Sequence, residues 1–363
     1  MKNVKYYILI CFFVIFSCVS SNISATENKN VFESVIERVQ QSVVLLSTNP
    51  NIDPETDLKK SGLCSGVVID TIGHVITNFH CVHNQNYIRL FYNDKDDWGI
   101  YEVNVIGVDP LADLALLKVI GKETPIPHLE FAEDTENLQS GTDVFALGHP
   151  MGMTWTVTKG IISSNERYAR HPFIKALQTD ASINKGNSGG PLMNMRGEIV
   201  GINALIVSKI SENAGIALAI RGDIVKNSLD SMLINGRVDR PAIGIMIMQL
   251  LQVKQRNKII KEFPELKQKY VPNTFGIFVR PDKNLSKGGL KGFDTIIAIN
   301  DKLTNSGLEF SDEIYKHNIG DKVTLTIIRK QKFKKVDVTL KLFPVNVDAM
   351  YSQPALPLKL KKP

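Results

Sequence analysis

Short runs of β-branched and apolar residues, separated by turns, fill most of the chain between residues 43 and 220. The first set is Val43–Ser47, Leu63–Asp70, His74–Asn78, Tyr87–Tyr92, Val103–Asp109 and Asp113–Val119. The second set follows the polar stretch Ala132–Gly141 and consists of Asp143–Leu147, Thr156–Ser163, Ala176–Thr179, Pro191–Asn194, Glu198–Ile206 and Gly215–Ile220. Two groups of about six short strands favour paired antiparallel β-barrels over an α/β sheet.

Two segments with helical spacing of apolar residues flank this region. Val31–Val39 predicts a short helix packed on a barrel, and Asp223–Leu233 predicts an amphipathic helix that ends before Gly236. The dipeptide Arg240-Pro241 then marks a domain boundary. We therefore expect the barrels to form one domain over residues 26–236.

A smaller strand-rich unit follows the boundary. We assign residues 240–344 to it, and it contains a Lys-rich helical insert at Gln252–Tyr270. The Pro- and Lys-bearing segment 345–363 is expected to be a disordered tail.

The N-terminus has the pattern of an export signal. Lys2 and Lys5 precede an apolar run from Tyr6 to about Val19, which is shorter than the roughly 20 residues of a membrane-spanning helix. We expect residues 1–25 to be a signal peptide and the protein to reach the periplasm or cell envelope. Lipidation at Cys18 and an uncleaved membrane anchor are the alternatives.

The overall composition is that of an ordinary globular protein. The 363 residues include 43 Lys and Arg against 37 Asp and Glu, and these charges are dispersed. Because no basic face with interleaved aromatic residues stands out, nucleic-acid binding is not expected. No pattern in the sequence predicts a metal ion or another cofactor.

The hexapeptide Gly186-Asn187-Ser188-Gly189-Gly190-Pro191 gives the first indication of chemistry. Glycines on both sides of a serine allow a tight turn that presents the hydroxyl as a nucleophile. The N–H groups of Gly186 and Ser188 would hold the negative oxygen, and we assign the oxyanion hole to Gly186, Asn187 and Ser188. A hairpin without a catalytic role is the alternative.

A serine nucleophile needs a base, which is usually a histidine oriented by a buried acid. His80 follows a predicted strand through a short turn that would aim it inward, whereas His83 is expected at the surface. Asp113 enters an apolar run, and a buried carboxylate there requires a partner. Taken alone, each residue could instead be structural, as a turn histidine or a strand-capping aspartate.

The order of these residues along the chain favours catalysis. His80, Asp113 and Ser188 follow the order of chymotrypsin-like proteases, which differs from that of subtilisins and α/β-hydrolases. The local motifs around them resemble the HtrA (Deg) family. These motifs are Thr77–His80, Asp113–Leu117, Gly148–Gly152, Val157–Ser163, Thr179–Pro191, Gly201–Asn203 and Gly215–Ile220.

The resemblance covers roughly residues 31 to 343. It implies a mainly β fold, in which a chymotrypsin-like double six-stranded antiparallel β-barrel is followed by a PDZ domain. It also implies an ATP-independent serine endopeptidase of the cell envelope that acts on unfolded or damaged proteins. A homotrimer is the smallest assembly that the resemblance implies.

Substrate preference follows from the same resemblance. In chymotrypsin-like proteases the residue six positions before the nucleophile lies at the base of the primary pocket, and here it is Ser182. Ala204, Leu218 and Ala219 are expected to line the rest. A small apolar pocket favours Val, Ile, Ala or Leu before the scissile bond, because a Lys or Arg would be buried without a partner.

The C-terminal unit resembles a circularly permuted bacterial PDZ domain. Its carboxylate-binding loop would be Ala242-Ile243-Gly244-Ile245, which takes up the C-terminus of a peptide. Two features depart from the family pattern. Phe293 stands between Gly292 and Asp294, and the insert at Gln252–Tyr270 is longer than usual.

Cys64 and Cys81 are the only cysteines beyond the N-terminal signal. An even pair in an exported chain predicts a disulfide, which would tether the turn that holds His80. Many secreted chymotrypsin-like proteases bridge these places, whereas the HtrA family usually has small or apolar residues there. Two buried free thiols are the alternative.

Two functions therefore stay open. The leading one is an exported quality-control protease whose partners are unfolded proteins and peptide C-termini. The alternative is a peptide-sensing regulatory protease or chaperone-like binding protein with little constitutive proteolysis. A catalytically dead scaffold is disfavoured because all three triad positions are present.

Overall fold

The computed structural model describes residues 30–49, 51, 63–94, 97–121, 127–150, 153–168, 174–204, 215–244, 248–250, 253–266, 271–281, 285 and 289–343. The predicted signal peptide and C-terminal tail lie outside these residues. Helix α2 (Val31–Gln40) begins the described chain. No helix among the described residues combines the length and the apolar character needed to cross a membrane.

Six antiparallel strands form the first barrel, which closes in the order β1-β2-β3-β6-β5-β4. They are β1 (Val43–Ser47), β2 (Leu63–Val68), β3 (His74–Thr77), β4 (Arg89–Asp94), β5 (Asp97–Asp109) and β6 (Leu114–Val119). One cluster that includes Val44, Val75 and Leu117 fills its interior. A short helical turn, η2 (Phe79–Cys81), follows β3. The end of β3 therefore leads directly into the turn that contains His80.

A second barrel closes in the order β10-β11-β12-β9-β8-β7. Its strands are β7 (Asp143–Gly148), β8 (Thr156–Tyr168), β9 (Lys175–Thr179), β10 (Pro191–Asn194), β11 (Ile199–Ala204) and β12 (Ala217–Arg221). Val144, Leu177 and Val200 belong to its buried core. The turn with Ser188 lies between β9 and β10, so the two barrels supply different parts of the candidate site.

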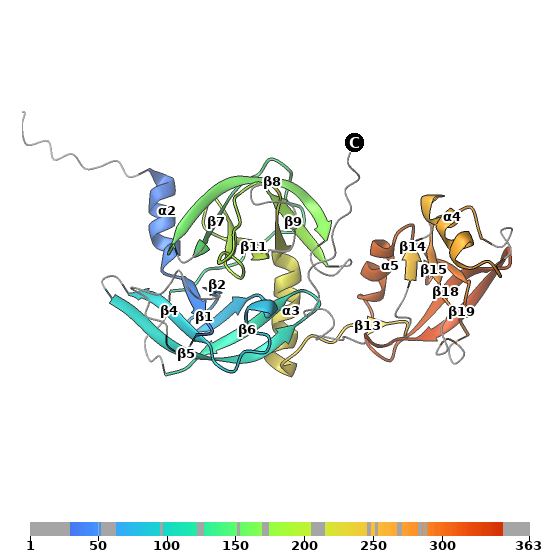
Figure 1. Cartoon of the computed structure of the whole chain (residues 1–363), viewed down its shortest axis with the longest axis horizontal. Coiled ribbons are helices and arrows are strands. Elements are labelled where there is room, and N and C mark those ends of the chain that lie inside the picture. The colour runs from blue at the N-terminus through green and yellow to red at the C-terminus, as the bar shows by residue number, and fades with distance from the viewer. Residues whose placement is uncertain are drawn as a thin grey trace, which may run out of the picture. The chain divides into compact units, whose positions relative to one another are not determined.

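Helix α3 (Gly222–Asn235), yellow in Figure 1, contacts β5 of the first barrel and β11 and β12 of the second. A Cβ on Gly107 would lie 2.5 Å from the Met232 Cβ, so glycine permits the close approach of β5 to the helix. The helix ends at Asn235, and the following Gly236, with a φ of 69°, forms a left-handed cap. This end is the one predicted from the sequence.

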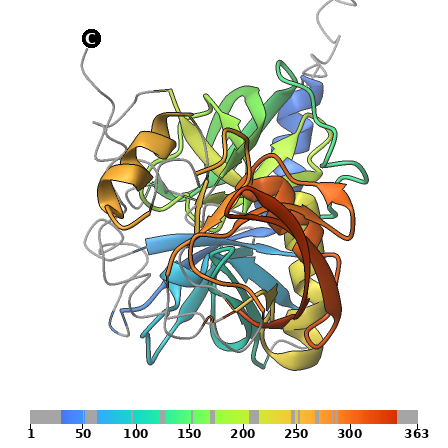
Figure 2. The same ribbon diagram turned by 90° about the vertical axis from the view of Figure 1, so that its right-hand side faces the viewer.

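The C-terminal unit contains a six-stranded sheet and a two-stranded sheet (Figures 1 and 2, orange to red). The larger sheet follows the order β14-β15-β16-β18-β19, with β17 paired to β16. Its elements and their neighbours are β13 (Pro241–Ala242), β14 (Met248–Leu250), α4 (Val253–Glu262), β15 (Ile277–Val279), β16 (Thr295–Ile299), β17 (Lys302–Leu303), α5 (Gly307–Ile314), β18 (Lys322–Arg329), β19 (Lys332–Thr339) and β20 (Lys341–Leu342). In the smaller sheet β13 pairs with β20.

The two departures from the PDZ pattern pack against each other. The insert forms α4 and then Phe263, whose ring centroid lies 5.5 Å from that of Phe293 and 6.2 Å from that of Phe278 in β15. Phe293 has a φ of 71°, a left-handed conformation that few bulky residues adopt. Asp294, next to it, is fully buried and accepts from the Arg329 guanidinium at 2.7 and 2.6 Å. The additional phenylalanine therefore packs against the insert, while the buried aspartate keeps Arg329 as its ion-pair partner.

The predicted fold class is confirmed, since both groups of strands close into six-stranded antiparallel barrels. One predicted strand boundary was wrong, and the difference affects the candidate site. Asp113 was placed inside a strand, but β6 begins at Leu114, and Asp113 has a φ of 57°. Its backbone turns before the strand, which frees the carboxylate to face η2 rather than a neighbouring strand.

Candidate active site

The nucleophile turn is built from glycines that permit contacts no larger residue would allow. Gly189 has a φ of 84°, and a Cβ there would lie 2.2 Å from Thr77 Oγ1 and 2.3 Å from the Ser65 carbonyl. Gly186 has a φ of 104°, and its Cβ would lie 2.1 Å from the His149 carbonyl. The turn is therefore pressed against β2 and β3 of the first barrel. Ser188, between these glycines, is 3% exposed.

Ser65, in β2, joins this turn to the first barrel. Its N–H donates to the Ser188 carbonyl at 2.8 Å, and its hydroxyl donates to the Gly186 carbonyl at 2.7 Å. The same hydroxyl accepts from the His149 N–H at 3.2 Å. The Ser65 carbonyl accepts from the Thr77 hydroxyl at 2.7 Å. One buried serine thus fixes the backbone on both sides of the nucleophile.

His80 and Asp113 are in direct contact. The His80 Nδ1 lies 2.7 Å from Asp113 Oδ2, and the His80 backbone N–H donates to Asp113 Oδ1 at 2.9 Å. The Asp113 carbonyl in turn accepts from the Phe79 N–H and from Asn78 Nδ2, each at 3.0 Å. The Asp113 side chain is fully buried, whereas that of His80 is 25% exposed. A buried carboxylate on Nδ1 leaves Nε2 as the nitrogen that can exchange a proton.

A second buried aspartate, Asp109, lies four residues earlier and has a different role. Arg240 donates to both of its carboxylate oxygens at 2.5 Å, and the Ser228 hydroxyl donates to Oδ2 at 2.8 Å. The carboxylate is fully buried, so this ion pair neutralises it. Asp113, which meets a histidine instead, is the one suited to orient a base.

One oxyanion donor expected from the sequence is corrected. The Asn187 N–H donates to the Asn184 carbonyl at 3.0 Å, within the loop that precedes the nucleophile. That hydrogen bond directs the backbone N–H of Asn187 into the loop, away from the carbonyl of a bound substrate. The oxyanion assignment therefore rests on the N–H groups of Gly186 and Ser188, as in the two-donor arrangement of this protease class.

His149 lies under the nucleophile turn and is fully buried. Its Nδ1 accepts from the Trp155 N–H at 3.3 Å, and the two rings meet edge to face with centroids 5.1 Å apart. Burial lowers the pKa of His149 from its ordinary 6.5 to about 3. The ring is therefore neutral at any pH at which a protease of this kind would work.

Comparisons with known proteins agree with this geometry. A trypsin-like peptidase domain matches residues 64–202, and a PDZ domain matches residues 243–340. The chain is similar to the probable serine protease do-like of Buchnera aphidicola subsp. Acyrthosiphon pisum, with 34% identity over 80% of this chain and 59% of the relative. It is 33% identical to the periplasmic serine endoprotease DegP of Salmonella typhimurium, over 78% of this chain and 57% of that protein. The chain thus combines a trypsin-like peptidase domain with a PDZ domain, and its curated relatives are do-like and DegP serine proteases.

A solved structure supports the family at the level of the fold. The HtrA-type protease AlgW with tripeptide has a TM-score of 0.71 and 26% identity, and the match covers 86% of this chain and 98% of that one. The chain spans only 59% and 57% of the two curated relatives described above. What those longer proteins do as wholes therefore comes to this chain as a proposal.

The structure brings together some of the residues expected to line the substrate pocket of an HtrA protease. Ala204 of β11 pairs with Leu218 of β12, so these two buried side chains share one face of the sheet. Ala219 was expected to line this pocket, but it belongs to the buried core of the second barrel. Adjacent residues of a strand point to opposite faces, so Ala219 faces inward while Leu218 faces the other way. Ser182 is exposed, and its carbonyl accepts from the Thr158 hydroxyl at 3.0 Å.

The expected PDZ carboxylate loop begins at β13. Ala242 pairs with Lys341, and Ile243 is buried in the core of the C-terminal unit. Gly244 follows in a left-handed conformation, with a φ of 76°, and is exposed. Ile245, the last expected residue of this loop, lies outside the described residues.

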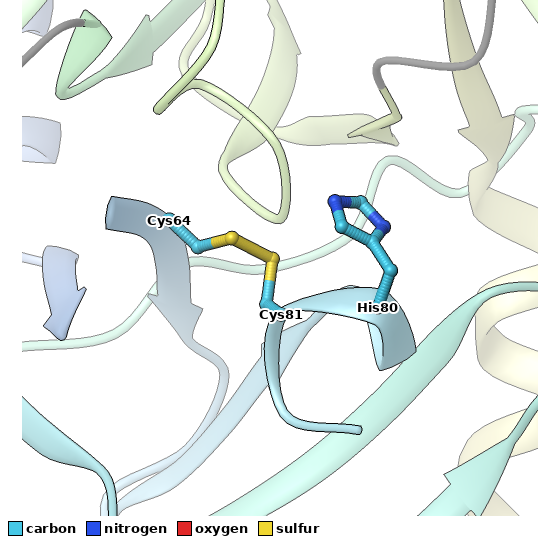
Figure 3. Close-up of side chains that lie close together, drawn as sticks. All are labelled: Cys64, His80 and Cys81. Atoms are coloured by element: carbon cyan, nitrogen blue, oxygen red, sulfur yellow. A yellow bond between two sulfur atoms is a disulfide. The ribbon is translucent and has the colours of Figure 1, made fainter. Parts of the chain in front are cut away.

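The cysteine pair lies beside the candidate base. Cys64 in β2 and Cys81 in η2 are joined by a disulfide, with their Cα atoms 6.1 Å apart, and Figure 3 shows the bridge next to the His80 ring. The bridge ties η2 to the strand that also carries Ser65.

Sequence reasoning missed Ser65, Thr77 and His149 as supports of the site. Each supports the site through partners that are distant in sequence, such as the 121 positions between Ser65 and Gly186. The only local signal was the position of Ser65 and Thr77 next to Cys64 and Asn78, inside apolar strands where a hydroxyl needs a partner.

Proposed function

We propose that this HtrA-family chain is an exported serine endopeptidase that cleaves unfolded or damaged proteins. The observation that carries the proposal is the contact of His80 Nδ1 with the buried Asp113 carboxylate at 2.7 Å, beside a glycine turn that holds Ser188. The signal-like N-terminus supports export, and DegP of Salmonella typhimurium is named periplasmic. We assign the peptidase domain to residues 26–236 and the PDZ domain to residues 240–344.

In the proposed mechanism the Ser188 hydroxyl attacks the scissile carbonyl while His80 Nε2 accepts its proton. Asp113 keeps the imidazole in the tautomer with the proton on Nδ1 and stabilises the imidazolium that forms. The N–H groups of Gly186 and Ser188 stabilise the negative oxygen of the tetrahedral intermediate. His80 then protonates the leaving amine, and water hydrolyses the acyl-enzyme by the same steps in reverse order.

The PDZ unit would bind peptide C-termini. Strand β14 stands at one end of the strand order, so an extended peptide could add to its edge, and Gly244 precedes it with the left-handed backbone that a carboxylate-binding loop uses. A homotrimer is the assembly that the family resemblance favours. Both proposals can be tested with purified protein, by binding of a free-acid peptide against its amide and by light scattering.

Degradation of an unfolded substrate such as reduced casein tests the proposal. We expect the wild-type protein to degrade it, and Ser188→Ala and His80→Ala to lose this activity. His83→Ala is the matched control, because His83 lies in the same turn but packs on the Phe79 ring, with centroids 4.9 Å apart. Equal degradation by Ser188→Ala and wild type would overturn the proposal.

The same variants separate the alternative. If wild-type protein leaves casein intact while both it and Ser188→Ala suppress aggregation of an unfolded protein, the chaperone-like function is the correct one.

A further inference from the structure

Three potential metal ligands lie close together, and one of them is His80, the proton acceptor of the proposed triad. One ligand atom from each of Cys64, His80 and Cys81 lies within 4.8 Å of the others. Figure 3 shows the two sulfur atoms on one side of the His80 ring. Because His80 Nδ1 contacts Asp113, the ring can bind an ion through Nε2 without giving up that contact.

We propose that reduction of the Cys64–Cys81 disulfide converts this cluster into an inhibitory site for Zn²⁺ or a divalent transition-metal ion with similar ligand preference. The inference rests on the proposed function, since the ion would take the same Nε2 that must accept the Ser188 proton. Nothing in the oxidised protein would bind the ion in this way, because both sulfurs are committed to the bridge.

The chemistry balances with a dithiol as reductant. The dithiol gives two electrons and two protons to the disulfide, so the S–S bond breaks, two protein thiols form, and the dithiol becomes a disulfide. The ion then displaces the two thiol protons, because the thiolate is the form that binds metal.

The dimensions fit a tetrahedral site. Zinc bonds of about 2.3 Å to sulfur and about 2.0–2.1 Å to nitrogen place neighbouring ligand atoms roughly 3.6–3.8 Å apart. The ligand atoms already lie within 4.8 Å, and rotation of the two cysteine side chains can part the sulfurs while the Cα atoms stay 6.1 Å apart. Two thiolates and one imidazole leave a fourth position for water, a ligand set that zinc accepts.

Asp113 supplies the outer partner that such a site needs. Histidines that bind metal usually donate their other ring nitrogen to a carboxylate, which fixes the ring and raises its basicity. Here that carboxylate is fully buried, and its second oxygen is held by the His80 backbone N–H at 2.9 Å. The arrangement that prepares His80 as a base therefore also prepares it as a ligand.

Cobalt binding tests the site without using activity. Ser188→Ala protein would be reduced anaerobically with a water-soluble phosphine, which takes oxygen from water as the disulfide becomes two thiols. Titration with Co²⁺ should then give thiolate-to-cobalt absorption at one ion per chain, reversed by Zn²⁺, and no such absorption before reduction. Cys64→Ser, Cys81→Ser and His80→Ala should each weaken binding, and Asp113→Asn should weaken it about 10- to 100-fold.

The activity arm uses protein with Ser188 intact. Zn²⁺ should inhibit the reduced enzyme, a chelator should restore activity, and the oxidised enzyme should be unaffected at the same concentration. Casein cleavage with no cobalt absorption after reduction would overturn the metal site and leave the protease proposal intact. Cobalt absorption in a protein that never cleaves casein would uphold the site and overturn the proposed function.

Discussion

Acid should destabilise this protein through His149, a residue outside the proposed triad. The ring is fully buried beneath the nucleophile turn, and burial lowers its pKa from 6.5 to about 3. In the unfolded chain the same ring would titrate near its ordinary value. Between these two values the unfolded chain binds a proton that the folded protein excludes.

The sign and size of the effect follow from linkage. Stability is complete above about pH 6.5, falls as the pH drops through the window between 6.5 and 3, and levels off below it. Each pKa unit corresponds to about 1.4 kcal/mol. At pH 5, which is 1.5 units below 6.5, His149 alone should therefore lower the free energy of unfolding by about 2 kcal/mol.

Chemical denaturation measures this effect. Unfolding in urea would be followed by tryptophan fluorescence at pH 7.5 and pH 5, in the Ser188→Ala background to prevent self-digestion. The Trp155 ring meets the His149 ring edge to face, so its signal reports the region around His149. The comparison is with His149→Asn, whose amide oxygen can replace Nδ1 as the acceptor of the Trp155 N–H.

The quantity that decides is the change between the two pH values, which is separate from the stability cost of the substitution itself. We expect the pH-induced loss to be about 2 kcal/mol smaller in His149→Asn than in the parent protein. Equal losses in both proteins would refute the reasoning and would mean that the His149 ring reaches a proton when folded.

Three further predictions concern the site and the domains. Ser65→Ala should lower kcat/KM about tenfold or more, because the Gly186 carbonyl and the His149 N–H lose a buried partner worth about 1–3 kcal/mol. Ser47→Ala is its control, because the Ser47 hydroxyl accepts from the Asn49 N–H away from the nucleophile turn, and wild-type kcat/KM in Ser65→Ala would contradict the role of Ser65. Cleavage sites mapped by mass spectrometry should cluster after Val, Ile, Ala or Leu, and a majority after Lys or Arg would exclude the neutral pocket. Deletion of Ala242–Pro363 should leave a folded protease with altered regulation, since Arg240 and its buried partner Asp109 remain; an unfolded product would place the boundary elsewhere.

The strand content of this protein could be read from its sequence because β-branched runs and turns are local signals. β1 and β10 have the predicted bounds, Val43–Ser47 and Pro191–Asn194. Asp113 was misplaced because its left-handed backbone depends on contacts with Asn78 and Phe79. Propensity alone cannot anticipate such a conformation in an aspartate before an apolar strand.

The supports of the site could not be predicted because they depend on register and on distant partners. Leu218 and Ala219 are neighbouring apolar residues, so their residue types do not show which of them faces the pocket. Only the pairing of β11 with β12 decides that Leu218 shares a face with Ala204. Asp109 and Asp113 are also alike in sequence. Arg240, which lies 131 positions beyond Asp109, separates their roles.

Labelling with a fluorophosphonate tests the central claim most directly, because the reagent reacts with a serine that a base has activated. Intact mass followed by peptide mapping should find one adduct on Ser188 in wild-type and His83→Ala protein, none in Ser188→Ala, and greatly slowed labelling in His80→Ala. Labelling of a different serine, or equal rates in wild-type and His80→Ala protein, would contradict the proposed triad.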